Sequence, residues 1–310
     1  MDFEPGFEFR AVDGPMSKHA ATGPNPLGPL ADLPGTWKGQ GFNTIWRPHQ
    51  VGLPGDPPKQ DRFLELNLTT ETLQFTRIPG QIPNRGLLQP DIELFGLTYL
   101  QQITDKFENA GIHVEPGIWA TVPDTQNPAE KASVVRMASI PHGTTINAQG
   151  QALTVNGGPK IDTVSITPFA IGQPTKLFDF PEVKLATPTK FRFPQPPQLS
   201  EISQEMVTNP NSVLKEAIKN QNITKTTVLI ISTSPAAPLV GGGTDNIAFL
   251  HGENAKPNAD AALMTAIFWI ETVEEPDNHT YLQLQYTQTV LLNFNGLSWP
   301  HVSVATLRKV

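Results

Sequence analysis

The sequence predicts an all-β protein, folded as a single enlarged antiparallel barrel of about ten to twelve strands. Segments of alternating apolar and polar residues recur along the chain and are separated by turn signals, as half-buried strands require. The 31 prolines and 24 glycines imply many loops between these strands. Gly39 and Gly41 fall at period two in the first segment, and glycines inside a strand mark a bend or a close backbone approach. Closure into a barrel removes the unpaired edges that an all-β chain must otherwise protect.

The composition excludes several classes of function. The 310 residues include 22 basic and 29 acidic side chains without a cluster of lysine or arginine, so nucleic acid is not an expected partner. The absence of cysteine removes disulfides, thiolate metal sites and cysteine nucleophiles. The first residues lack the features of a signal peptide, and no apolar run of about 18 residues is present to span a membrane. A cytoplasmic protein is the simplest expectation.

Residues 1–30 are expected to form an N-terminal arm, and residues 31–310 are expected to form the barrel domain. The arm is rich in glycine, proline and small residues and shows no periodicity. It is either a loosely packed tail or a segment that contacts a partner subunit in a homo-oligomer. The first strand is expected in the stretch 33–48, where Trp37 shares the parity of the two glycines and can plug one end of the barrel.

The remaining strands are predicted from alternation and turn signals. They are expected at 62–68, 73–78, 91–107, 112–122, 133–140, 144–155, 160–169, 224–234, 264–273, 281–294 and 301–308. In the second strand Leu64, Leu66 and Leu68 share one face. The segment 281–294 has the clearest alternation, and Gln288 is the one polar residue on its apolar face.

Residues 170–223 are expected to form a Pro-rich insertion that ends in a helix. Six prolines from Pro174 to Pro197 break any sheet, so this part is interpreted as an irregular excursion over the surface. Apolar residues at helical spacing follow within 213–218, with Asn211 or Ser212 as the cap. This is the one helix that the sequence predicts.

One predicted strand face combines a histidine with a carboxylate. Within 112–122, His113, Glu115 and Trp119 share a face, and the opposite face is apolar. A carboxylate beside an imidazole fixes its tautomer and raises its basicity, which serves both a metal ligand and a general base. Pro116-Gly117 lies in the middle of the strand and predicts a bulge or kink. The alternative is an ordinary polar face that points to solvent.

Four other residues are candidates for ligand contacts. Arg136 lies in an otherwise apolar strand, where it can clamp a ligand carboxylate, pair with a buried acid or point outward. Gln288 suits an orienting contact inside a pocket. His142 ends a strand, where rim residues lie, and His301 begins the last one, and both also fit purely structural roles. No spacing typical of a multi-histidine metal site occurs, whereas a single haem ligand leaves no sequence signature.

Several motifs resemble known families. The segment Gly35-Thr-Trp-Lys-Gly-Gln-Gly41 resembles the Gly-x-Trp-x-Gly-x-Gly opening of nitrobindin-like and related calycin barrels, and lipocalins share a looser Gly-x-Trp. The closing segment 302–308 is compatible with their last strand. A poorly characterised family of microbial proteins, often labelled haem-binding, is similar in the blocks Gly41-Phe-Asn-Thr-Ile-Trp-Arg-Pro48, His113-Val-Glu-Pro-Gly-Ile-Trp119, Ile140-Pro-His-Gly143 and Phe294-Asn-Gly-Leu-Ser-Trp-Pro-His301.

The resemblance implies a calycin-like barrel whose cavity binds a hydrophobic small molecule, with haem as the most specific candidate cofactor. If haem binds, His113 or His301 would be the axial metal ligand and Arg136 a partner of a propionate, and peroxidase-like or nitrogen-oxide chemistry would follow. The other residues expected around the ligand are His142, Gln288, Trp37 and Trp119. The chain departs from nitrobindins in being much longer and in having its C-terminal histidines at the starts of strands.

Two other functions remain open from the sequence. The first is a cofactor-free hydratase or isomerase for a hydrophobic substrate, with His113 and Glu115 as its acid–base pair. The second is a structural or interaction protein without chemistry that assembles through the N-terminal arm.

Overall fold

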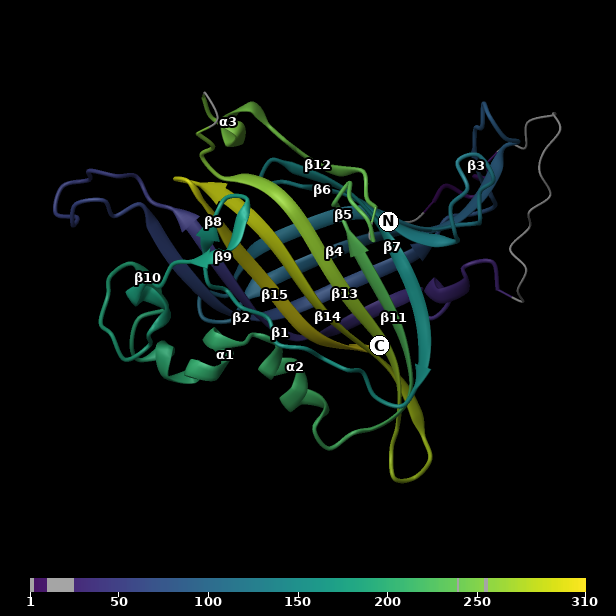
Figure 1. The fold of residues 1–310 in the computed structure, drawn as a ribbon. Helices are drawn as coiled ribbons and strands as arrows, with labels where there is room; N and C mark the ends of the chain where they lie inside the picture. The colour runs from purple at the N-terminus through teal and green to yellow at the C-terminus, as the bar shows by residue number, and fades with distance from the viewer. Residues whose placement is uncertain (1–2, 10–24, 239, 254–255) are drawn as a thin grey trace.

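The computed structural model describes residues 3–9, 25–238, 240–253 and 256–310, and within these residues ten long antiparallel strands close into one barrel (Figure 1). Each strand pairs with the next in chain order, and the last pairs with the first. This confirms the predicted all-β fold class and its strand number. The barrel strands are β1 (Gly35–Pro48), β2 (Arg62–Arg77), β4 (Ile92–Asp105), β5 (Ala110–Val122), β6 (Ser133–Ile140), β7 (Thr144–Asn156), β11 (Asn222–Ser232), β13 (Asp260–Glu274), β14 (Thr280–Phe294) and β15 (Leu297–Lys309).

The barrel closes where β1 pairs with β15, in a register that runs from Trp37 opposite Lys309 to Thr44 opposite Val302. Gly39 makes this approach feasible, because a Cβ on it would overlap the Thr306 carbonyl oxygen on β15. A Cβ on Gly41 would likewise overlap backbone of the same strand. The close backbone approach predicted from the two glycines is therefore confirmed.

One end of the barrel is plugged by apolar side chains. Trp37 is fully buried, and its indole Nε1 donates a hydrogen bond of 2.8 Å to the Leu33 carbonyl. Leu27, the N-cap of the short 3-10 helix η1 (Gly28–Leu30), and Leu30, its last residue, pack into the same core cluster. Leu27 and Leu30 thus belong to the barrel core, although the sequence placed them in the arm. Of that predicted arm, residues 1–2 and 10–24 lie outside the described residues.

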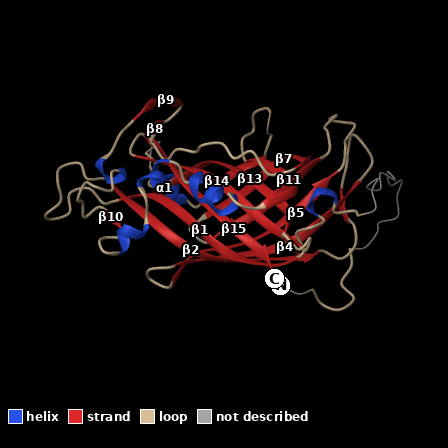
Figure 2. Ribbon diagram, turned by 90° about the horizontal axis from the view of Figure 1, so that it is seen from below, coloured by secondary structure: helices blue, strands red, loops and turns tan. Residues whose placement is uncertain are grey.

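A second apolar core lies outside the barrel wall. The insertion between β7 and β11 packs over the outer faces of β1, β2 and β13 to β15, where it buries Trp46, Leu64 and Trp299. Figure 2 shows its short helices grouped along the outside of the strands. The predicted surface excursion is therefore a packed layer. Its elements are β8 (Phe169–Ala170), β9 (Gln173–Leu177), η2 (Pro181–Val183), β10 (Arg192–Phe193), η3 (Gln198–Glu201), α1 (Gln204–Thr208) and α2 (Asn211–Ile218).

Two local predictions in this insertion were wrong. The predicted strand 160–169 is irregular until Phe169. The helix α2 forms as predicted, but Pro210 is its N-cap and no side chain caps it. Asn211 instead donates to the Asp162 carbonyl at 2.8 Å and accepts from the Thr287 hydroxyl at 2.6 Å, because it joins the helix to the barrel wall.

The predicted bulge at Pro116-Gly117 was also misplaced. The register between β4 and β5 shifts nearer the hairpin, between Ile103 and Thr104, and the pairs at Pro116 and Gly117 are regular. Strand β6 pairs with β5 only from Gly117 onward, so the proline lies where that ladder has ended. Gly117 instead makes room for an aromatic ring, since a Cβ there would overlap the Tyr99 side chain.

Three small elements complete the fold: β3 (Ile82–Asn84) on β4, β12 (Gly243–Asn246) on β7, and the short helix α3 (Ala248–His251). No helix in the described part of the chain is long and apolar enough to cross a membrane.

Candidate ligand-binding cavity

A cavity of about 410 Å³ lies inside the barrel at the end opposite the Trp37 plug. Its volume falls within the range of roughly 300–1,000 Å³ that small-molecule sites occupy. Most of its wall is aliphatic, because the strands alternate and send one apolar residue in two toward the interior. The apolar lining consists of Ile45, Ile103, Ile112, Ile140, Ile146, Leu250, Ala259, Ala261, Met264, Val290 and Leu292, with Pro48 at the rim.

The segment that carries β12 and α3 covers part of the cavity mouth. Thr244 and Leu250 of this segment line the cavity. The segment is fixed to the turn between β6 and β7 by a hydrogen bond of 2.9 Å from the Ile247 amide to the Gly143 carbonyl. The mouth is therefore narrowed by elements that are far apart in the sequence.

Three of the predicted histidines meet at this cavity, although they lie on different strands and turns. His113, His142 and His301 all line it, and the ring centroids of His113 and His142 are 5.8 Å apart. The Nε2 atom of His301 lies 2.9 Å from the Asn43 side-chain oxygen. Burial, together with the nearby His113 and His142, lowers the pKa of His301 to about 3, so its ring is neutral at physiological pH.

Beneath His113 lies the carboxylate that the sequence paired with it. The Nε2 atom of His113 lies 3.2 Å from Oε2 of Glu115. Glu115 is fully buried, which by itself would raise its pKa, but Arg136, His113 and Tyr99 together hold that pKa at about 2. Glu115 is therefore ionised and acts only as a hydrogen-bond acceptor.

Arg136 points inward and pairs with this buried acid, one of the alternatives that the sequence left open. Its guanidinium donates to Glu115, to the Tyr99 hydroxyl at 2.8 Å and to Oε1 of Gln288 at 2.7 Å. The side chain is 2% exposed, and each of its terminal nitrogens is engaged by the protein. It holds the cavity floor together and does not itself line the cavity, so it is not placed to clamp a ligand.

The predicted site residues therefore separate into three groups. His113, His142, His301 and Gln288 line the cavity. Glu115 and Arg136 lie beneath it, and Trp119 packs below them, with the Arg136 guanidinium carbon 5.9 Å from its ring centroid. Trp37 is part of the plug at the far end.

Sequence reasoning missed a second polar group in the floor. The Tyr286 hydroxyl lies 2.8 Å and 2.9 Å from the two carboxylate oxygens of Glu71, and Gln101 donates to Tyr286 at 3.0 Å. The sequence did not identify Glu71 as a candidate, because the leucines of 62–68 lie on the opposite face of the strand from Glu71. That leucine face looks like the one that faces the core. It packs instead against the outer layer, so the opposite face of β2, with Glu65 and Glu71, points into the barrel.

Replacing Glu71 by glutamine is expected to raise stability at alkaline pH and to change it little in acid. Burial raises the pKa of Glu71 from 4.5 to about 7, so the folded protein keeps a proton that the unfolded chain releases between these values. The free energy of unfolding therefore falls as pH rises through this window, by at most about 3 kcal/mol from this one group. Denaturant unfolding of both proteins across pH measures the difference, and a difference that is constant with pH would contradict the assignment.

Metal coordination by several side chains has no support in the described residues, where no group of three or more His, Asp or Glu is arranged to hold a metal ion. A single axial ligand, as for haem, does not require such a group.

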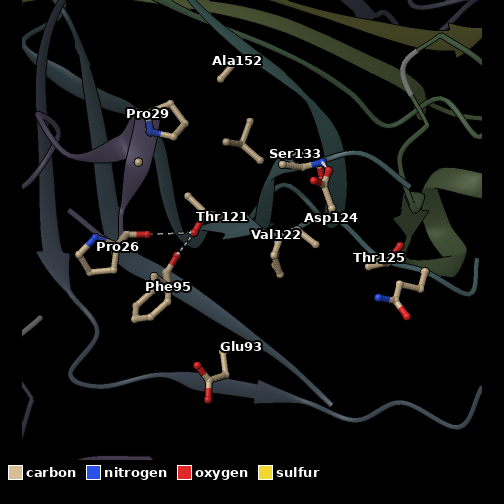
Figure 3. Close-up of a pocket in the computed structure, with 15 residues that line it drawn as sticks. Pro26, Pro29, Glu93, Phe95, Thr121, Val122, Asp124, Thr125, Ser133 and Ala152 are labelled. Carbon is tan, nitrogen blue, oxygen red and sulfur yellow. Dashed lines mark hydrogen bonds between the residues drawn. The ribbon is translucent and has the colours of Figure 1, made fainter. Parts of the chain in front are cut away.

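A second hollow of about 490 Å³ lies at the plugged end (Figure 3). It is an open groove between η1 and the strands β4 to β7, with Pro26, Phe95 and Thr121 in its wall. The Thr121 hydroxyl hydrogen-bonds to the backbone carbonyls of Phe95 and Pro26, so these polar groups are paired with each other within the groove wall. None of the residues singled out from the sequence lines this groove.

The fold and its cavity define an up-and-down β-barrel, in which consecutive antiparallel strands surround a ligand-sized space that opens at one end. No family model matches the chain, and no curated protein matches it. Among solved structures, Rv2717c from M. tuberculosis is similar, with a TM-score of 0.39 and 14% sequence identity over 92% of this chain and 96% of that chain. This similarity carries no information about the ligand.

Proposed function

We propose that this protein binds a small, mostly apolar molecule in the cavity at the open end of the barrel. The observation that carries the proposal is the combination of an aliphatic wall with a few convergent polar groups in a space of about 410 Å³. The three histidines and Gln288 are among those polar groups, which also include the amide and hydroxyl side chains of Asn43, Gln101, Thr144, Thr244, Tyr286 and Ser303. The aliphatic wall supplies affinity, because burial of apolar ligand surface contributes roughly 25 cal/mol per Å².

The floor of the cavity supports the proposal because it is held rigidly before any ligand arrives. Arg136 connects Glu115, Tyr99 and Gln288, and Gln101 and Tyr286 hold Glu71. A site whose polar groups are already fixed loses less conformational entropy on binding. Such a floor suits recognition of a ligand of defined shape.

Filling the cavity should weaken ligand binding strongly without unfolding the protein. Ala261 is buried on β13 and lines the cavity, so Ala261→Phe is expected to weaken binding of the neutral apolar dye N-phenyl-1-naphthylamine by at least about tenfold. Its neighbour Ala262 is exposed, and Ala262→Phe is the matched control that should bind like the unaltered protein. Dye fluorescence measures binding, and circular dichroism confirms the fold of both variants. Absence of saturable binding by the unaltered protein, or equal binding by a folded Ala261→Phe variant, would contradict the proposal.

Haem is the specific occupant that the motif resemblance suggests, and the donor chemistry of the cavity fits an axial ligand. Ligating histidines usually donate their second ring nitrogen to a carboxylate or carbonyl, and His113 and His301 both have such a partner. Arg136 does not fit the expected role at a propionate, since it is buried beside Glu115 and does not line the cavity. Arg47 at the rim is the arginine that lines the cavity. Haem bound there would supply redox and gas-binding chemistry, and haemin titration of the same proteins tests this.

A second candidate function is acid–base catalysis without a cofactor, which the contact between His113 and Glu115 favours. The ionised carboxylate fixes the orientation of an imidazole that borders an apolar cavity, and this arrangement suits a general base. Turnover of lipophilic substrates that is lost in His113→Ala and kept in Ala262→Phe would support this function over binding alone.

A further inference from the structure

The positions of the imidazole protons can be derived from the groups that contact each ring. The Nε2 atom of His113 faces the ionised carboxylate of Glu115, which can only accept a hydrogen bond. That nitrogen therefore carries the proton. In the neutral ring, Nδ1 of His113 is then left with a lone pair.

The same argument applies to His301 on the opposite side of the cavity. Its Nε2 atom lies 2.9 Å from Oδ1 of Asn43, and this oxygen already accepts a hydrogen bond of 2.6 Å from the Ser303 hydroxyl. An amide oxygen cannot donate, so the proton is again on Nε2 and the lone pair is on Nδ1. Burial keeps the pKa of His301 low, so this ring stays a neutral acceptor.

Amide and hydroxyl side chains also line the cavity, but charged groups there are few. The amide oxygen of Gln288 accepts from Arg136, which leaves the Gln288 amide nitrogen as a donor. Of the described residues that line the cavity, only Arg47 and Glu65 are aspartate, glutamate, lysine or arginine. They form a salt bridge with each other, with Nε of Arg47 2.9 Å from Oε1 of Glu65. A carboxylate ligand would therefore meet imidazole lone pairs and no unpaired guanidinium or ammonium group, and burying a charge without a partner is costly.

We infer that the cavity selects a neutral alcohol or phenol over a carboxylic acid of the same shape. The ligand hydroxyl would donate to Nδ1 of His113 or His301 and accept from the amide of Gln288. This inference rests on the proposed function, because it names the chemical class of the molecule bound in the same cavity.

Three naphthalenes of matched shape test the inference at neutral pH: 2-naphthol, 2-naphthoate and 2-methylnaphthalene. Isothermal titration calorimetry on the full chain is expected to show 2-naphthol binding at least about tenfold more tightly than either of the others. His113→Phe and His301→Phe keep an aromatic ring and remove the lone pair. At least one of them is expected to reduce the affinity for 2-naphthol to that for 2-methylnaphthalene, while the affinity for 2-methylnaphthalene is unchanged.

The outcomes separate this inference from the proposal on which it rests. Equal affinity for all three compounds, or tighter binding of 2-naphthoate, would overturn the inference and leave apolar binding in the cavity intact. Unchanged binding of 2-naphthol by both phenylalanine variants would also overturn it. Failure of all three compounds and the dye to bind would overturn the proposed function as well.

Discussion

Replacing Glu115 by glutamine is expected to lower the free energy of unfolding by about 3–5 kcal/mol at neutral pH. The substitution keeps the size of the side chain but leaves the guanidinium of Arg136 charged, buried and without its carboxylate. Removing one partner of a buried ion pair is costly because the remaining charge keeps its desolvation penalty. Denaturant unfolding monitored by tryptophan fluorescence measures the loss.

A double variant distinguishes this cause from general damage to the floor. Glu115→Gln combined with Arg136→Met removes both charges and is expected to recover most of the stability lost in the single variant. If the double variant is as unstable as the single one, the loss comes from packing or hydrogen bonds, and the unpaired charge is not its cause.

Replacing Gly39 by alanine is expected to cost about 3 kcal/mol or more, the upper end of what overpacking usually costs. The new methyl group would overlap the Thr306 carbonyl and lie 2.8 Å from the Cα atom of Leu307. These are backbone atoms of β15, so the seam that closes the barrel must separate. Thermal unfolding measures the effect.

The matched control is Gly111→Ala, because an added Cβ at Gly111 meets no atom within 4 Å. This substitution in β5 is expected to leave the melting temperature nearly unchanged. If the two variants had similar melting temperatures, the close approach of β1 and β15 would not be what requires glycine at position 39.

Much of the fold could be predicted from the sequence because local periodicity reports which residues share a strand face. The alternation in 281–294 and the glycines of β1 gave the strand and its close contact correctly. Periodicity does not report which face is covered, so the leucines of β2 concealed an inward polar face. The outer layer that covers them is irregular and rich in proline, and its packing depends on contacts that no local pattern encodes.

The candidate site could be predicted only in part for a related reason. His113 and Glu115 are two residues apart on one strand, so their shared face was readable from spacing. The meeting of His113 with His142 and His301 depends on closure of the barrel, and no spacing in the chain encodes it. For Arg136 the sequence identified an unusual position, but the identity of its partner became evident only from the register of β5 and β6.

Chemical-shift mapping of the labelled protein with N-phenyl-1-naphthylamine shows directly whether a ligand occupies the histidine-lined cavity. We expect the dye to shift the side-chain signals of His113, His301 and Met264, which line the cavity. Shifts confined to Thr121 and Ser133, in the groove at the plugged end, would contradict this expectation.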